Sequence, residues 1–307
     1  MRAIEFPRRG AHHSRGMRTA RLLSFLPGIR KLVRDNRRLR AELERLKSGV
    51  GDGRGILRAT ASKMFGAVAS AARGDSSHTG GAVGEFCPKE ASYILAPKLG
   101  AAYVQIPKSA CSSIMARILA VERPETYAGL PAQIERIPFV LHHADGIFDR
   151  SQSAHDLLRF TFVRHPFDRV LSYYINQINP PVDASAALIE EVERAGFRIR
   201  MPFDDYVARI REDQVVRNNH HVRPQAEFLV GARGLTVDFI GKVEEMESHW
   251  ARLDAALGGN LGPIARLNYT GGNSWRGSAL FDQRVVEALA EHYRYDLWLL
   301  DYGIDRA

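Results

Sequence analysis

The chain has 307 residues, of which 45% are hydrophobic and 25% are charged, and these values are ordinary for a globular protein. No apolar run approaches the roughly 18–20 residues that a membrane span needs, and the N-terminus shows no signal-peptide pattern. Two cysteines, Cys87 and Cys111, are too few for a disulfide framework, and no metal-ligand spacing surrounds them. We therefore expect a cytoplasmic protein with no metal site.

The net charge of +8 is unevenly placed along the chain. Residues 1–47 hold 14 Lys/Arg and 4 Asp/Glu, a balance of +10, so the remaining residues sum to −2. We expect residues 1–28 to form a basic, disordered arm. Such an arm can contact an anionic membrane surface peripherally, and the alternative is a solvated basic segment. We expect no nucleic-acid partner.

A heptad pattern follows the arm over residues 29–50. Its a and d positions are filled, in chain order, by Ile29, Leu32, Asn36, Leu39, Leu43, Leu46 and Val50. An Asn at an a position favours a parallel dimer in fixed register, so we predict a short coiled coil that forms a homodimer. The alternative is an amphipathic helix packed on its own domain. Residues 51–85 are rich in Gly, Ala and Ser and indicate a linker, which leaves residues 86–307 as the folded domain.

Within the folded domain, apolar runs alternate with segments of helical periodicity. The expected strands and helices cover residues 101–106, 114–121, 159–163, 167–178, 236–257 (a strand and then a helix) and 281–300. This alternation predicts an α/β fold with a P-loop-like parallel sheet and helices on both faces. Ligands of such sheets bind beyond the carboxyl ends of the strands, where two polar motifs fall.

The first motif is IPKSACSS, residues 106–113, at the turn from the first strand to the first helix. It lacks the Gly-rich spacing of the common nucleotide loop. A strand-to-helix turn directs backbone N–H groups and the positive helix end at an anion. Lys108 adds a positive charge, and Ser109, Ser112 and Ser113 add hydroxyl donors, so we predict a phosphate or sulfate site. The alternative is a Ser112 or Ser113 N-cap beside an incidental lysine.

The second motif is FVRHPFDRVLSYY, residues 162–174. Arg164 follows a strand directly, and Pro166 stands where it can begin the next helix. The planar guanidinium of Arg164 suits bidentate phosphate binding, and Arg169 and Ser172 follow on the helix. Two separate anion sites suggest a nucleotide with both a 5′ and a 3′ phosphate. ATP does not need two such sites.

Together the motifs resemble the two signatures of sulfotransferases that use 3′-phosphoadenosine 5′-phosphosulfate (PAPS). The resemblance is strongest to the carbohydrate sulfotransferase branch, which includes Golgi enzymes and bacterial relatives. The first motif resembles the 5′-phosphosulfate loop. The 3′-phosphate pattern R-x-P-x-x-R-x-x-S-x-Y is filled by Arg164, Pro166, Arg169, Ser172 and Tyr174. The stretches DFIGKVEEMESHW and HYRYDLWLLDYG are similar to further parts of that branch, so the resemblance covers roughly residues 100–303.

The resemblance implies a role for each motif residue. Lys108 would bind the 5′-phosphosulfate and its bridging oxygen, and Arg164 and Ser172 would bind the 3′ phosphate. The rest of the donor-binding loop would be Ser109, Ala110, Cys111, Ser112 and Ser113. Sulfuryl transfer needs stabilisation of charge on the transferred group and on the leaving oxygen, and it requires no metal. The implied acceptor is a carbohydrate or a glycolipid.

A base must accept the proton of the acceptor hydroxyl, and histidine is the usual group near neutral pH. His142 and His143 precede the second strand, where heparan 2-O-type relatives have a His-x-His, and we favour this pair. The rival is His221, in a stretch similar to an H-x-x-P-Q that shapes the acceptor site in relatives. Glu227 is a further candidate.

Two other functions stay open at this point. A P-loop-like kinase of a small metabolite would need a Walker-type loop and a carboxylate for magnesium, and neither is evident in the sequence. A non-catalytic scaffold with a nucleotide fold would tolerate the loss of Lys108. The chain lacks the membrane anchor and lumenal cysteine pairs of the Golgi relatives. We therefore expect a bacterial enzyme in the cytoplasm, acting close to the inner membrane.

Overall fold

The computed structural model describes residues 92–129, 147–231, 234–265, 267 and 274–304, all within one compact unit. The predicted arm, coiled coil and linker lie outside the described residues, and so do His142 and His143.

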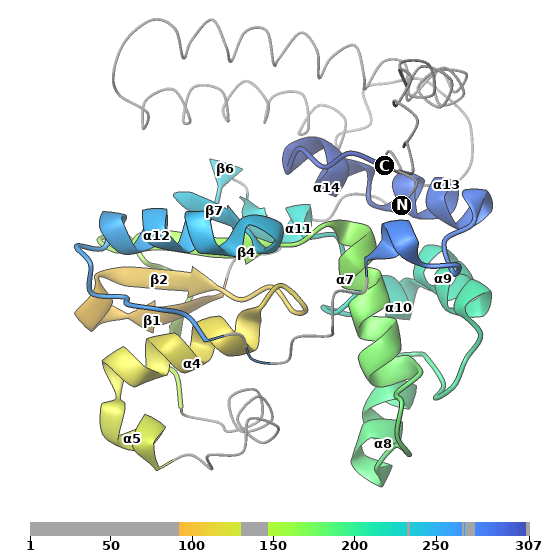
Figure 1. Cartoon of the computed structure of the whole chain (residues 1–307), viewed down its shortest axis with the longest axis horizontal. Coiled ribbons are helices and arrows are strands. Elements are labelled where there is room, and N and C mark those ends of the chain that lie inside the picture. The colour runs from red at the N-terminus through yellow and green to blue at the C-terminus, as the bar shows by residue number, and fades with distance from the viewer. Residues whose placement is uncertain (1–91, 130–146, 232–233, 266, 268–273, 305–307) are drawn as a thin grey trace, which may run out of the picture. The chain divides into compact units, whose positions relative to one another are not determined.

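Five strands form the central sheet (Figure 1). Their order is β3 (Arg150–Ser151), β1 (Tyr93–Ala96), β2 (Ala101–Val104), β4 (Leu158–Val163) and β7 (Phe239–Lys242). β2, β4 and β7 run parallel to one another, as the sequence predicts, whereas β1 runs antiparallel to both β2 and β3. The three parallel strands place the two predicted motifs at the same edge of the sheet.

The antiparallel strand β1 was not predicted, and its connection to β2 explains why. A 3₁₀ turn, Pro97–Leu99, and Gly100 with φ 64° reverse the chain directly into β2. Glycine adopts this left-handed conformation without steric cost. Because no helix separates the two strands, the alternation of strand and helix signals does not apply to them.

Helices cover both faces of the sheet, as the sequence predicts. α4 (Cys111–Glu122) and α12 (Met246–Ala256) pack in the core on one face. Residues of α11 (Ala226–Leu229) and the end of α14 (Arg294–Leu299) contribute to the core on the other. Figure 1 shows α4 and α14 on opposite sides of the strands.

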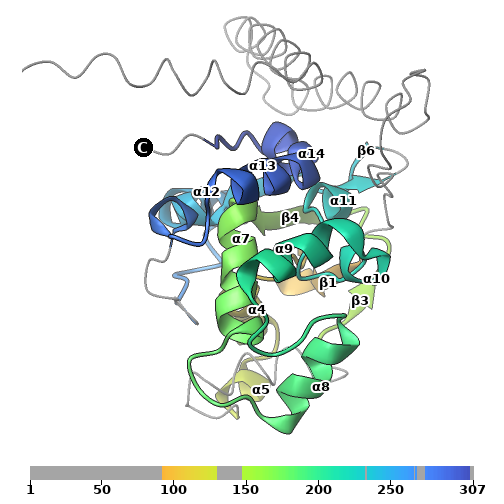
Figure 2. The same ribbon diagram turned by 90° about the vertical axis from the view of Figure 1, so that its right-hand side faces the viewer.

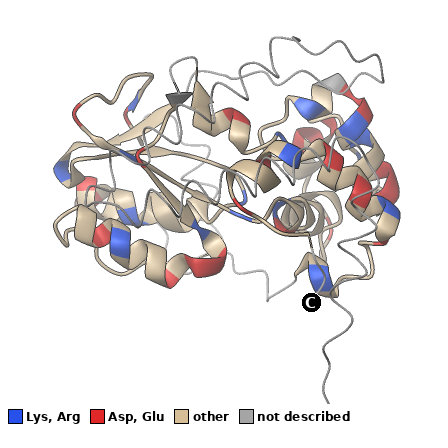
Figure 3. Cartoon of the chain, turned by 90° about the horizontal axis from the view of Figure 1, so that it is seen from above, with Lys and Arg blue, Asp and Glu red and all other residues tan. Residues whose placement is uncertain are grey.

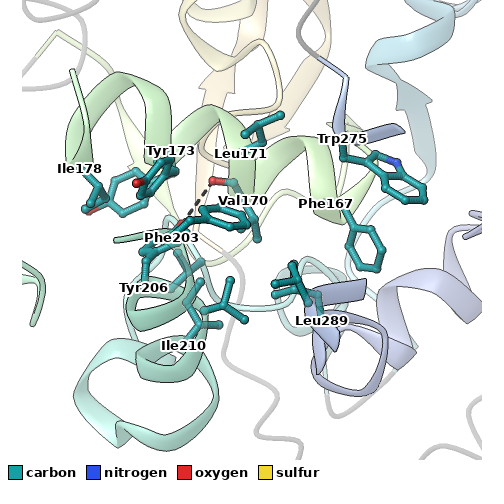
Figure 4. Close-up of a cluster of buried hydrophobic side chains, with 14 of the residues drawn as sticks. Phe167, Val170, Leu171, Tyr173, Ile178, Phe203, Tyr206, Ile210, Trp275 and Leu289 are labelled. Carbon is teal, nitrogen blue, oxygen red and sulfur yellow. Dashed lines mark hydrogen bonds between the residues drawn. The ribbon is translucent and has the colours of Figure 1, made fainter. Parts of the chain in front are cut away.

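A second core surrounds α7 (Pro166–Tyr173), which follows β4. Figure 2 shows α7 beside further helices. These are α8 (Ala186–Arg194), α9 (Phe203–Glu212), α10 (Gln214–Arg217) and α13 (Gln283–His292). Figure 4 shows the aromatic side chains that fill this core, where the Tyr206 hydroxyl donates to the Val170 carbonyl at 3.3 Å. The core makes α7 a rigid support for the second motif.

Two expected helices differ in detail from the prediction. The helix expected at 167–178 is α-helical through Tyr173 and continues as a π-helical turn, Tyr174–Ile178. The final helix, expected at 281–300, is instead the pair α13 and α14, which meet at Tyr293. The fully buried Tyr293 donates its hydroxyl to the carbonyl of Val222 at 2.5 Å, and the break turns Asp296 into the core.

The smaller elements connect these layers. They are α5 (Pro124–Ala128), the two-stranded pair β5 (Val230–Gly231) and β6 (Gly234–Leu235), and 3₁₀ turns at Val243–Glu245 and Trp275–Gly277. Figure 3 shows acidic and basic residues interspersed on the helices. None of the helices described here is long and apolar enough to cross a membrane.

Candidate active site

The turn after β2 has an unusual backbone. Lys108 and Ala110 have φ values of 65° and 59°, in the left-handed region that residues other than glycine seldom adopt. Ala110 is the N-cap of α4 and makes no side-chain cap hydrogen bond, so the predicted alternative of a serine cap is wrong. Strain of this kind is concentrated at ligand-binding and catalytic sites. The first-turn N–H groups of α4 have no partner within the helix, so they suit an anion.

Lys108 is half-buried in this turn. Burial lowers the pKa of its ammonium group to about 8, and the guanidinium groups of Arg164 and Arg169 act in the same direction. Its Nζ atom lies 5.6 Å from the centre of the Tyr173 ring. A cation that is partly desolvated among other cations is stabilised by an anionic ligand. The electrostatics of Lys108 therefore fit a phosphate or phosphosulfate site.

The other residues of the loop are largely buried. The Ser109 hydroxyl is fully buried and donates to Gln225 Oε1 at 3.2 Å, and Ser113 Oγ accepts from the backbone N–H of Leu267 at 2.9 Å. Ser112 and Cys111 are also buried, and burial raises the pKa of the Cys111 thiol. A thiol that stays protonated fits a small packing residue and not a nucleophile.

Arg164 brings the second motif against the first. It follows β4 directly, and its Nη1 atom donates to the Lys108 carbonyl at 3.5 Å. Pro166 occupies the first turn of α7, and Ser172 is buried on that helix, where it accepts from Asn176 Nδ2 at 3.4 Å. The two predicted anion sites are thus neighbours at the carboxyl ends of adjacent parallel strands.

His165, between Arg164 and Pro166, has a structural role. Its Nδ1 atom accepts from the Phe167 N–H at 3.2 Å, and its Nε2 atom lies 2.9 Å from the Gly303 carbonyl. Burial lowers its pKa to about 4, so the ring is neutral at physiological pH, with the proton on Nε2. Both ring nitrogens are engaged, which excludes His165 as a base.

Arg169 is fully buried and contacts three backbone carbonyls. Its Nε atom donates to Pro107 at 3.0 Å, and Nη1 and Nη2 donate to Arg223 and His220, each at 2.8 Å. The guanidinium therefore joins the turn before Lys108 to residues 220–223. The motif alone placed Arg169 in the site without indicating this function.

His221 and Lys108 both lie against the Tyr173 ring. The His221 ring stacks on the Tyr173 ring, with centroids 4.6 Å apart and planes at 9°, and Lys108 Nζ approaches the same tyrosine. The Nε2 atom of His221 lies 4.0 Å from Glu191 Oε1 on α8, a carboxylate that no motif predicted. Glu227, the other described candidate, instead pairs with Arg223 at 3.7 Å.

A mostly parallel sheet with helices on both faces, and two cationic turns at the carboxyl ends of adjacent parallel strands, define a P-loop-like α/β protein. A family model described as the sulfotransferase family matches residues 91–303, and the chain belongs to that family. The resemblance to sulfotransferases is thereby confirmed, and the protein is a transferase of sulfuryl groups. Searches of curated proteins and of solved structures each found no match.

Proposed function

We propose that the protein transfers the sulfuryl group of PAPS to a hydroxyl group of a carbohydrate or glycolipid. The observation that carries this proposal is the contact between the two anion-binding turns, Arg164 Nη1 to the Lys108 carbonyl at 3.5 Å. Two cationic turns on adjacent strands suit a ligand with phosphate groups at both its 5′ and 3′ ends. A Walker-type kinase uses one such turn for a single polyphosphate chain.

The residues have distinct tasks in this reaction. The acceptor oxygen bonds to sulfur, the bond from sulfur to the bridging oxygen breaks, and the acceptor proton passes to a base. The products are a sulfate ester and adenosine 3′,5′-bisphosphate. Lys108 and the N-terminus of α4 stabilise the negative charge that develops on the bridging oxygen. Arg164 and Ser172 bind the 3′ phosphate and so fix the position of the nucleotide.

A calorimetric titration without magnesium tests the donor. Adenosine 3′,5′-bisphosphate should bind far more tightly than ATP, because only the bisphosphate reaches both turns. A preference for ATP, or binding that requires magnesium, would overturn the proposal and support the kinase. Binding of neither nucleotide would support the scaffold. A positive result justifies a screen of carbohydrate acceptors with labelled donor.

The Arg164→Ala variant tests the 3′-phosphate assignment. Charged hydrogen bonds contribute about 1.5–3 kcal/mol, so the affinity for adenosine 3′,5′-bisphosphate should fall by roughly 10- to 100-fold. The matched control is Arg198→Ala, because Arg198 is exposed on the surface. Equal affinities of the two variants would remove Arg164 from the site.

For the base we propose His221 in place of the pair His142 and His143, because its ring lies against the Tyr173 ring that Lys108 Nζ also approaches. Glu191, 4.0 Å from His221 Nε2, would stabilise the imidazolium that forms.

His221→Gln should lower turnover of an acceptor found in the screen by about 10²–10⁴-fold, the usual contribution of general-base catalysis. The affinity for adenosine 3′,5′-bisphosphate should not change, because the imidazole serves the acceptor. The control is the exposed His155→Gln. Full turnover of His221→Gln, with loss in His142→Gln or His143→Gln, would assign the base to that pair.

A further inference from the structure

We propose that Gln225 is a positioning residue that sets the spacing of the two phosphate-binding turns, so that both phosphates of one nucleotide bind as a unit. The inference rests on the proposed function, because it needs a nucleotide with two separate phosphate groups. Neither motif contains Gln225, and the stretch around it was expected to shape the acceptor site.

The side-chain amide of Gln225 connects one turn to the other. Its Oε1 atom accepts from Ser109 Oγ at 3.2 Å and from the backbone N–H of Arg164 at 3.0 Å. Its Nε2 atom donates to the carbonyl of Arg164 at 2.7 Å. The amide thus pairs with both backbone groups of Arg164, as a neighbouring strand would. A flipped amide would oppose donor to donor and acceptor to acceptor, so these contacts fix its orientation.

Gln225 is itself fixed from the far side by Asp296 on α14. The Asp296 carboxylate accepts from the backbone N–H groups of Gln225 and Ala226, each at 2.8 Å, and from Gln225 Nε2 at 3.4 Å. Gln225 and Asp296 are both fully buried. A buried carboxylate is costly unless it is hydrogen-bonded, and these three donors meet that need. Gln225 therefore cannot move without exposing polar groups to an apolar core.

Arg169 provides a second, independent connection to the same segment. It joins the Pro107 carbonyl, just before Lys108, to the carbonyls of His220 and Arg223, just before Gln225. The turn after β2, residues 107–110, would bind the 5′ phosphate, and it is therefore held to residues 220–225 at two points. The turn after β4, which carries Arg164, would bind the 3′ phosphate, and it is held to Gln225. The contacts make the two turns one rigid body.

Rigid spacing has a thermodynamic consequence. The ribose fixes the separation of the 5′ and 3′ phosphates in the ligand. When the protein fixes the matching separation, binding of one phosphate delivers the other at high effective concentration. When the two turns can move relative to each other, the entropy lost in ordering them reduces the gain in affinity. Gln225 should therefore matter for the bisphosphate and much less for a ligand with a single phosphate.

The test is a set of calorimetric titrations with three nucleotides. Adenosine 3′,5′-bisphosphate, adenosine 5′-monophosphate and adenosine 3′-monophosphate are each titrated into the unchanged protein, Gln225→Met and Gln283→Met. Methionine keeps the side-chain length and removes the amide. In Gln225→Met we expect the affinity for the bisphosphate to fall about tenfold or more and that for each monophosphate by less than about threefold. Gln283 is an exposed control whose side-chain amide donates to Glu287 on the same helix, so Gln283→Met should bind as the unchanged protein does.

Each outcome decides between the proposals. The coupling is supported if the ratio of the affinity for the bisphosphate to that for each monophosphate falls in Gln225→Met and stays unchanged in Gln283→Met. Equal losses for all three ligands, or no loss, would show that Gln225 contributes only to folding and would overturn it. If the unchanged protein shows no preference for the bisphosphate, the proposed function fails and the coupling fails with it. Where Gln225→Met does not fold, Ser109→Ala removes the hydrogen bond that the Ser109 hydroxyl donates to Gln225 Oε1. A loss of affinity for the bisphosphate that exceeds the loss for adenosine 5′-monophosphate supports the coupling, and an equal loss for both would assign the hydroxyl to the 5′ phosphate and overturn the coupling.

Discussion

Lys108 differs from a surface lysine in both conformation and environment. Its φ of 65° is strained, it is half-buried, and burial lowers its pKa to about 8. Strain and desolvation both oppose folding, and a bound anion offsets the desolvation by favouring the charged form. At the scale of a single residue, the unfavourable conformation and burial of Lys108 are therefore consistent with a binding site for an anion.

This lowered pKa predicts how nucleotide binding depends on pH. A bound bisphosphate favours the ammonium form and raises the pKa of Lys108 above its free value of about 8. Affinity should therefore be constant from about pH 7 to 8 and fall above pH 8, by up to about tenfold per pH unit. His220, whose pKa burial lowers, is already neutral in this range, and the phosphates, which titrate near pH 6, are already ionised.

Calorimetry of adenosine 3′,5′-bisphosphate binding between pH 7 and 9.5 measures this decline. Lys108→Arg is the control, since a guanidinium stays charged over the whole range and its profile should be flat. A flat profile for the unchanged protein would show that the Lys108 charge does not contact the nucleotide.

At the scale of elements, the close packing of β4 against β7 supports the turn that carries Arg164. Gly241 of β7 pairs with Phe162 of β4, and a Cβ atom at position 241 would lie 2.3 Å from Phe162 Cε1. The Phe162 ring is fully buried, with ring centroids 5.8 Å from Trp250 and 6.2 Å from Phe239. The ring has little room to move away from an added methyl group.

We therefore predict that Gly241→Ala lowers the free energy of unfolding by about 1–3 kcal/mol, the usual cost of overpacking a core. Urea unfolding followed by circular dichroism measures the change. Gly277→Ala is the control, because a Cβ atom at that position would meet nothing within 4 Å. Equal stability of the two variants would mean that the strands separate easily at this point.

The sequence predicts the elements whose signals are local. The apolar runs that became β2 and β4 are each followed by a polar turn and an amphipathic helix, so strand direction and both motifs could be inferred. β1 could not, because a short hairpin joins it to β2. The break at Tyr293 could not either, since the hydroxyl of this residue hydrogen-bonds to Val222, 71 residues away.

The residues of the candidate site also differ in whether the sequence predicts them. Lys108 and Arg164 stand at strand ends within recognisable motifs. Gln225 and Asp296 were missed because their partners are remote: Gln225 lies 61 residues from Arg164 and 71 from Asp296. Both residues stand in stretches that resemble the family, but neither stretch indicates a hydrogen bond to a segment so far along the chain. Only the folded chain brings them together.

At the scale of the whole molecule, the sequence places both the excess positive charge and the predicted dimerisation heptad in the N-terminal segment. Residues 1–47 carry +10 and the rest of the chain −2, and the heptad at 29–50 adjoins this basic arm. A dimer formed there would present two basic arms together, which strengthens attraction to an anionic membrane surface carrying a glycolipid acceptor. Both ideas are proposals drawn from the sequence.

Deleting residues 1–50 tests the dimer. We predict that light scattering changes from the mass of a dimer to that of a monomer, because the apolar a and d positions that drive association are removed. Binding of adenosine 3′,5′-bisphosphate should be unchanged, since every described contact of the two turns lies within residues 92–304. Asn36→Leu in the full chain is the complementary variant: a leucine at this a position removes the polar group that favours two strands, so larger oligomers should appear. A dimer that persists after the deletion would place the interface on the sulfotransferase domain itself.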